Sequence, residues 1–275
     1  MPIRLAHPPD PDSAFAFHGL AAGKVDRRGL EIEITVQDLA GLNDLACRKC
    51  FEATVVSAHA YGLVACDYAL SSAGGIFGHD TGPVVISAEP IQPSQIAQLT
   101  VATAATTTSA YLAYSLLSPA LRTMVLPGDK LIAAVQTGLV PCALVAHTNR
   151  MTAALPGLHE VIDLGKWWCS RNKPLPMPLH VTALRRDLDP SCQQRLVAVI
   201  RDSVRFGLAN PVEALVAAER FSPIDGARLR DHVLGCVTEM SLDMGQLGRS
   251  AIDRFLSQGD EAALLFAPQT LDVID

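Results

Sequence analysis

The sequence carries little charge and has no strongly basic region. Charged side chains make up 18% of its 275 residues, and the net charge is −6. Its densest basic groups are only pairs, such as Arg27-Arg28 and Arg185-Arg186. Because proteins that bind nucleic acid concentrate lysine and arginine on one face, we expect no nucleic-acid partner.

Long apolar runs are missing as well. No stretch reaches the roughly 20 apolar residues that a membrane helix needs. Residues 1–9 show no basic segment followed by an apolar one, which a secretory signal would require. We therefore expect no membrane partner and a cytoplasmic location.

The cysteines form no recognisable framework. Seven of them are scattered along the chain, which is typical of free thiols in a reducing compartment. Cys47 and Cys50 have CxxC spacing but no second pair to complete a zinc site, so metal or redox chemistry there is a minor alternative. A GxxxxGK[ST] loop for a nucleoside triphosphate is also absent. We expect neither a metal nor a cofactor.

Apolar residues are plentiful, at 49% of the chain, which is enough for two lobes with their own cores. Short apolar strands alternate with helices up to about residue 184, and the chain is helical from Asp189 onward. This order predicts an α/β fold with a helical tail. Residues 161–168 are expected to be extended, and the prolines at 174–178 to form a stiff crossing between lobes.

The segment from Cys142 to Thr152 is the strongest candidate for a functional site. Residues 143–146 predict a short buried strand that ends at His147, and Arg150 follows on the loop. In α/β proteins ligands bind outside the carboxyl ends of strands. A histidine that merely ends a strand is the plainer alternative, and this segment alone favours it slightly.

Other polar residues lie where strands end or helices begin. Ser57 ends a predicted strand, and residues 106–109 place four hydroxyls before an apolar helix. Such a row can cap the helix, or it can bind an anion together with the free amide groups of the first turn. Four hydroxyls exceed what one cap requires, which favours the anion site. His59 is a weaker candidate for the cleft, and His232 is predicted to be structural.

Short motifs follow one another along nearly the whole chain. In order, they are Phe15-Ala-Phe-His-Gly-Leu20, Leu42-Asn43, Ser57, Gly82-Pro-Val-Val85, Thr108-Ser109-Ala110, Asp163-Leu-Gly-Lys-Trp-Trp168, Leu175-Pro-Met-Pro-Leu179 and Ser241-Leu-Asp-Met-Gly245. Their order and spacing resemble those of the 1,4-dihydroxy-6-naphthoate synthase family of menaquinone biosynthesis. The family motif His-Glu-x-Arg-x-Thr corresponds to His147-Thr-Asn-Arg-Met-Thr152.

The resemblance implies a type II periplasmic-binding-protein-like fold with a ligand cleft between two lobes. We expect residues 1–89 and 179–275 to form lobe I and residues 90–178 to form lobe II. The implied enzyme is a carbon–carbon lyase that converts cyclic dehypoxanthine futalosine to 1,4-dihydroxy-6-naphthoate. His147 is the implied general base, and the implied substrate-binding residues are Asn43, Ser57, Thr108, Ser109 and Arg150. The expected partner is a small carboxylate, and the expected state is a monomer or homodimer.

The chain departs from the family pattern at three places. The first loop reads His7-Pro-Pro-Asp-Pro-Asp-Ser13 instead of Ser-Pro-Cys-Pro-Asn-Asp-Thr, so Asp12 is expected to take over part of the lost pair's role. Thr148 stands where the family has glutamate, and a His-Ala-Gln-Glu segment is not recognisable at 217–221. These departures leave two alternatives open: a binding protein without catalysis, or a lyase similar to chorismate dehydratase.

Overall fold

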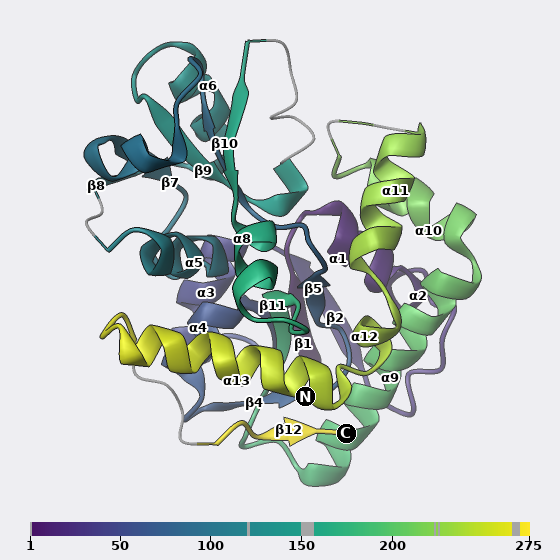
Figure 1. Cartoon of the computed structure of the whole chain (residues 1–275). Coiled ribbons are helices and arrows are strands. Elements are labelled where there is room, and N and C mark those ends of the chain that lie inside the picture. The colour runs from purple at the N-terminus through teal and green to yellow at the C-terminus, as the bar shows by residue number, and fades with distance from the viewer. Residues whose placement is uncertain (1, 120–121, 150–156, 223, 225, 266–269) are drawn as a thin grey trace.

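The computed structural model describes residues 2–119, 122–149, 157–222, 224, 226–265 and 270–275, and it contains two β-sheets surrounded by helices (Figure 1). The larger sheet has the order β12-β4-β11-β3-β1-β2, and β5 also pairs with β11. Its strands are β1 (Ile3–His7), β2 (Ile32–Val36), β3 (Ala53–Ser57), β4 (Tyr68–Ser71), β5 (Ile76–Gly78), β11 (Met177–Arg185) and β12 (Val273–Ile274).

The smaller sheet has the order β10-β6-β9-β7-β8. Its strands are β6 (Val84–Ser87), β7 (Thr100–Thr103), β8 (Arg122–Val125), β9 (Cys142–Val145) and β10 (His159–Asp163). β9 is buried along its whole length, as its apolar run predicts, and it ends just before His147. The α/β fold predicted from the alternating pattern is therefore confirmed.

Helices fill the space around both sheets (Figure 1). In chain order they are α1 (Pro11–Ala16), α2 (His18–Ala21), α3 (Leu39–Cys47), α4 (Ala58–Val64), α5 (Ser109–Leu117), α6 (Leu131–Gln136), α8 (Leu164–Arg171), α9 (Pro190–Ala209), α10 (Pro211–Glu219), α11 (Gly226–Cys236), α12 (Glu239–Leu242) and α13 (Gly245–Glu261). Short 3₁₀ turns are η1 (Pro93–Gln98), η2 (Gly128–Lys130) and η3 (His147–Asn149). No helix in the described ranges is both long and apolar enough to cross a membrane.

Local capping explains where several helices begin. Asp38 accepts a hydrogen bond from the Gly41 amide at the start of α3, and Asp189 accepts from Ser191 and Cys192 at the start of α9. Both caps follow from the preference of aspartate for the position before a helix. The second cap confirms the helix start expected at Asp189.

The expectation that residues 161–168 are extended is wrong beyond Asp163. The Asp163 carboxylate accepts hydrogen bonds from the amides of Gly165 (2.8 Å) and Lys166 (3.1 Å), and this cap starts α8. Trp168 is fully buried and packs edge-on against Phe255, with 5.1 Å between ring centroids. The helix therefore places this tryptophan in the core.

The two sheets do not divide the chain at the predicted lobe boundaries. β6 lies within the range 1–89 expected for lobe I, yet it pairs antiparallel with β9 in the smaller sheet. The prolines expected to cross between lobes lead directly into β11, and Pro178 itself pairs with Phe77 of β5. By sheet membership, the chain passes to the smaller sheet before Val84 and has returned to the larger one by Met177.

Candidate functional site

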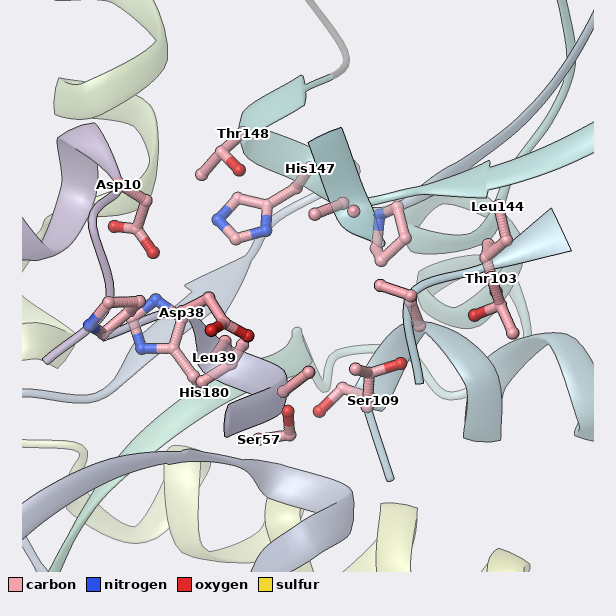
Figure 2. Close-up of a pocket in the computed structure, with 18 of the residues that line it drawn as sticks. Asp10, Asp38, Leu39, Ser57, Thr103, Ser109, Leu144, His147, Thr148 and His180 are labelled. Atoms are coloured by element: carbon pink, nitrogen blue, oxygen red, sulfur yellow. The ribbon is translucent and has the colours of Figure 1, made fainter. Parts of the chain in front are cut away.

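A cavity of about 650 Å³ lies between the two sheets. One wall comes from the loops after β1 and β2 together with Ser57 and His180, and the other from the ends of β7 and β9 and the start of α5 (Figure 2). Its volume falls within the roughly 300–1,000 Å³ typical of small-molecule sites. The predicted ligand cleft between lobes is confirmed as a feature of the fold.

His147 enters this cavity from the turn after β9, with Ser57 and Ser109 across from it (Figure 2). Its Nε2 lies 2.8 Å from Oδ2 of Asp12, which is fully buried at the start of α1. Burial alone would oppose the charge on Asp12, but hydrogen bonds from His147 and His232 outweigh that effect and hold the pKa of Asp12 well below its usual range. The carboxylate can only accept a hydrogen bond, so the hydrogen lies on Nε2 of His147. Nδ1 is thereby left with a lone pair.

Two further histidines surround this pair. His232 of α11 stacks on His147 with 5.8 Å between ring centroids, and its Nε2 lies 3.5 Å from Oδ1 of Asp12. The prediction that His232 is only structural is therefore incomplete, because its ring shares the Asp12 carboxylate with the candidate base. Cys236 follows one helical turn later on the same face of α11, and its sulfur also lies near the pair.

His180 of β11 lines the cavity 6.1 Å from His147, measured between ring centroids. It is 1% exposed, and neither ring nitrogen has a hydrogen-bond partner within the described part of the chain. Burial, followed by the nearby His147, lowers the pKa of His180 to about 3. A neutral imidazole with two unsatisfied nitrogens can both donate to and accept from a ligand.

The described lining is acidic. Asp10, Asp38 and Asp129 face the cavity, and no lysine or arginine is among the described residues that line it. Asp10 accepts a hydrogen bond from the Ser13 amide and caps α1. Burial, reinforced by the Asp12 carboxylate, raises the pKa of Asp10 to about 7.

The hydroxyls at the start of α5 already have protein partners. Thr108 accepts from the Tyr111 amide at 3.2 Å and caps the helix, and Ser109 donates to the Leu179 carbonyl at 2.6 Å. The capping interpretation is thus correct for Thr108. Both residues nevertheless line the cavity.

The other predicted site residues have different positions. Ser57 lines the cavity, whereas Asn43 is buried behind it. The Asn43 amide donates to Ser57 Oγ (3.0 Å), and its oxygen accepts from the Ser57 amide (2.9 Å), so it fixes Ser57 rather than lining the cavity. His59 is also held in place, with Nδ1 donating to the Thr108 carbonyl at 3.2 Å. Arg150 lies outside the described residues.

Sequence reasoning missed His180 and gave Asp12 only a general role. The i, i+4 spacing of His232 and Cys236 was visible and places both on one face of a helix. The pairing of Asp12 with His147 had no comparable signal, because 135 positions separate them in the chain.

Known proteins resemble this chain over nearly its whole length. A family model described as menaquinone biosynthesis matches residues 3–261. A 1,4-dihydroxy-6-naphthoate synthase of Thermus thermophilus is 32% identical over 97% of this chain and 96% of its own length, and one of Streptomyces coelicolor is 29% identical over 96% and 94%.

Solved structures agree with this fold. A crystal structure of a protein from Archaeoglobus fulgidus superimposes with a TM-score of 0.91 at 33% identity, covering 96% of this chain and 98% of that one. The periplasmic aliphatic sulphonate binding protein of Escherichia coli superimposes with a TM-score of 0.64 at 13% identity, covering 98% and 94%. The second likeness concerns the fold alone, and it confirms the periplasmic-binding-protein-like architecture.

Proposed function

This chain belongs to the menaquinone-biosynthesis family, and on that premise we propose that it is the lyase that converts cyclic dehypoxanthine futalosine to 1,4-dihydroxy-6-naphthoate. The names of its relatives support an enzyme of menaquinone biosynthesis. The observation that carries the proposal is the buried Asp12–His147 pair at the wall of the cavity.

His147 is the proposed general base. With Asp12 holding the hydrogen on Nε2, the Nδ1 lone pair takes a proton from the bound substrate, and the carboxylate stabilises the imidazolium that forms. Fragmentation of a carbon–carbon bond then releases the naphthoate. Proton transfer by a positioned side chain contributes a factor of roughly 10² to 10⁴ in rate.

The start of α5 is the proposed anchor for the substrate carboxylate. The amides of Ser109 and Ala110 have no partner within the helix, unlike that of Tyr111, and together with the positive end of the helix dipole they can attract an anion. Thr108 and Ser109 bring this helix end to the cavity wall, and Ser57 adds a hydroxyl. This anchor suits a substrate that carries its negative charge at one end, because the rest of the described lining is acidic.

His180 is well placed to bind an uncharged polar part of the substrate. Its pKa of about 3 keeps it neutral, so its ring can donate one hydrogen bond and accept another without adding charge to the cavity. A ligand that satisfies these nitrogens removes the cost of burying them unpaired, which is about 1–3 kcal/mol for each group.

A binding protein without catalysis is the second candidate, because the architecture is shared with the periplasmic binding proteins. Such a protein needs the cavity and the anchor but no oriented base. The short hydrogen bond between Asp12 and His147 favours the enzyme, since it leaves one imidazole nitrogen free to accept a proton.

The test is incubation with cyclic dehypoxanthine futalosine and, separately, with chorismate. We expect 1,4-dihydroxy-6-naphthoate to form from the first compound and no dehydration of the second. A ligand that binds unchanged would identify a binding protein, and turnover of chorismate would identify the other lyase.

The variant that tests His147 as the general base is His147→Asn. We expect it to lower turnover at least about 100-fold, the lower end of the range for acid–base catalysis, while substrate affinity stays within a few fold. His159→Asn, which changes an exposed histidine of β10, is the control and keeps full activity. Near-normal turnover in His147→Asn would overturn the assignment of the base.

A further inference from the structure

Four potential metal ligands meet beside the proposed base. Asp12, His147, His232 and Cys236 each offer one ligand atom, and these atoms all lie within 4.8 Å of one another. They come from three separate parts of the fold: the start of α1, the turn after β9, and one face of α11. The Asp12 carboxylate is fully buried, and its oxygen Oδ1 lies 3.5 Å from Nε2 of His232.

We propose that Asp12, His147, His232 and Cys236 bind one Zn²⁺ ion, and that this ion blocks the cavity's proton acceptor. Two imidazole nitrogens, a thiolate and a carboxylate form the mixed donor set that zinc takes in four-coordinate sites, whereas Mg²⁺ and Ca²⁺ require oxygen ligands.

The present spacing is close to that of a tetrahedral site. Zinc holds nitrogen and oxygen ligands at about 2.0–2.2 Å and sulfur at about 2.3 Å, so the ligand atoms lie roughly 3.3–3.8 Å apart. Here Nε2 of His147 lies 2.8 Å from Oδ2 of Asp12, and Nε2 of His232 lies 3.5 Å from the other carboxylate oxygen, Oδ1. The four ligand atoms lie at most 4.8 Å from one another, so bringing them to tetrahedral spacing needs side-chain movements of about 1 Å, which small changes in the side-chain dihedral angles allow.

Zinc binding displaces two protons from these ligand atoms. Asp12 is already ionised, and the Cys236 thiol releases one proton to solvent as its sulfur binds the metal. Nε2 of His147 gives its lone pair to zinc, so the hydrogen that it carried moves to Nδ1. Nδ1 can then no longer accept a proton from a ligand in the cavity.

With four protein ligands the site leaves no open position for water or substrate. Closed zinc sites are structural, whereas catalytic ones keep a position free. The ion would also tie α1 and α11 to the loop of the smaller sheet that carries His147. The ion therefore inhibits the enzyme and holds these elements together. The inhibitory role rests on the proposed function, whereas the metal site itself does not depend on it.

Cobalt is the probe for the site, because a thiolate bound to tetrahedral Co²⁺ gives a near-ultraviolet charge-transfer band and strong visible bands. The full chain is first treated with EDTA and dialysed, and then titrated with Co²⁺ and with Zn²⁺. We expect one ion per chain, a thiolate band, displacement of cobalt by zinc, and a higher melting temperature with zinc.

Cys236→Ala and His232→Gln are the test variants. Loss of outer-sphere partners lowers metal affinity about 10- to 100-fold, so loss of a direct ligand should lower it by at least about 100-fold. In Cys236→Ala the thiolate band should vanish, and His232→Gln should weaken binding while keeping the band. Near-ultraviolet circular dichroism verifies that both variants are folded.

The double variant Cys47→Ala/Cys50→Ala is the matched control, because it removes the CxxC pair, an exposed Cys47 and a half-buried Cys50, that could bind metal adventitiously. It should bind cobalt as the unchanged chain does. A band that persists in Cys236→Ala and vanishes in the double variant would overturn the proposal, and so would the absence of stoichiometric binding at micromolar metal.

Turnover separates the two proposals. Zinc should inhibit the unchanged enzyme reversibly, with EDTA restoring activity, and the inhibitory concentration should rise at least about 100-fold in Cys236→Ala. A cobalt band in a chain that shows no turnover would support the metal site and count against the lyase. Full activity with one zinc bound would refute the inhibitory role.

Discussion

Replacing Asp12 by asparagine tests how the proposed base is oriented. Asp12 is fully buried, and its carboxylate accepts a 2.8 Å hydrogen bond from Nε2 of His147. Asparagine keeps the size and the oxygen but removes the negative charge. Its NH₂ group can also donate to Nε2, which moves the hydrogen to Nδ1 and leaves the wrong tautomer facing the substrate.

The magnitude follows from this contact. A hydrogen bond to a charged group contributes about 1.5–3 kcal/mol, and about 1.4 kcal/mol is a factor of ten in rate, so loss of the charge lowers kcat roughly 10- to 150-fold. If the asparagine also fixes the wrong tautomer of His147, the decrease in kcat extends toward about 10⁴-fold, as in serine proteases when the buried aspartate beside the catalytic histidine becomes asparagine. KM should change little, because Asp12 is not among the residues that line the cavity.

The assay is steady-state kinetics in EDTA, so that metal binding does not contribute. Asp10→Asn is the control: Asp10 precedes α1, in which Asp12 lies, asparagine stays a good helix cap there, and Asp10 makes no hydrogen bond to His147 in the described part of the chain. We expect a change in kcat of less than about tenfold, the cost of roughly 1.4 kcal/mol. A folded Asp12→Asn variant with kcat within threefold of the unchanged enzyme would refute the orienting role.

Two further predictions concern stability, measured by urea unfolding. A Cβ added at Gly165 would lie 2.1 Å from the Thr81 carbonyl carbon, so Gly165→Ala should lower the free energy of unfolding by at least about 3 kcal/mol. A Cβ at Gly235 in α11 meets nothing within 4 Å, so Gly235→Ala should raise the free energy of unfolding by about 0.5–1 kcal/mol. Equal effects of the two variants would contradict this packing argument. The hydrogen bonds from Arg4 lower the pKa of Glu52, so its contribution of about 1 kcal/mol is present above the unfolded pKa of about 4.3 and lost as pH falls through the folded value. Glu52→Gln should therefore be destabilised at pH 7 and match the unchanged chain in acid, whereas Glu213→Gln, in an exposed pair with Lys24, should show a smaller difference at pH 7 because solvent screens that pair.

Local signals in the sequence were sufficient for much of the fold. The strands at Ile3–His7 and Ala53–Ser57 and the starts of α3 and α9 lie where periodicity and capping aspartates place them. The same rule was available for α8, because Asp163 is a good cap. Residues 161–168 were nevertheless expected to be extended, and the burial of Trp168 in the core depends on the helix that begins after this cap.

The candidate site was only partly predictable. His147, Ser57, Thr108 and Ser109 lie at the cavity because strand ends and helix starts gather at one edge of an α/β sheet. Asn43 was predicted to hold substrate, yet its hydrogen bonds position Ser57 instead. A chain pattern shows which element a residue occupies, but not whether its polar atoms are already used by the protein.

The sequence alone determined the fold class, the family resemblance and the candidate base, because apolar periodicity, caps and motif order act over short stretches of chain. Only the tertiary structure decided which groups surround that base. Asp12, His180 and His232 lie on α1, β11 and α11, and long-range packing alone brings them to His147. The tautomer of His147, the neutrality of His180 and the four-ligand cluster all depend on distance and burial, which no spacing along the chain encodes.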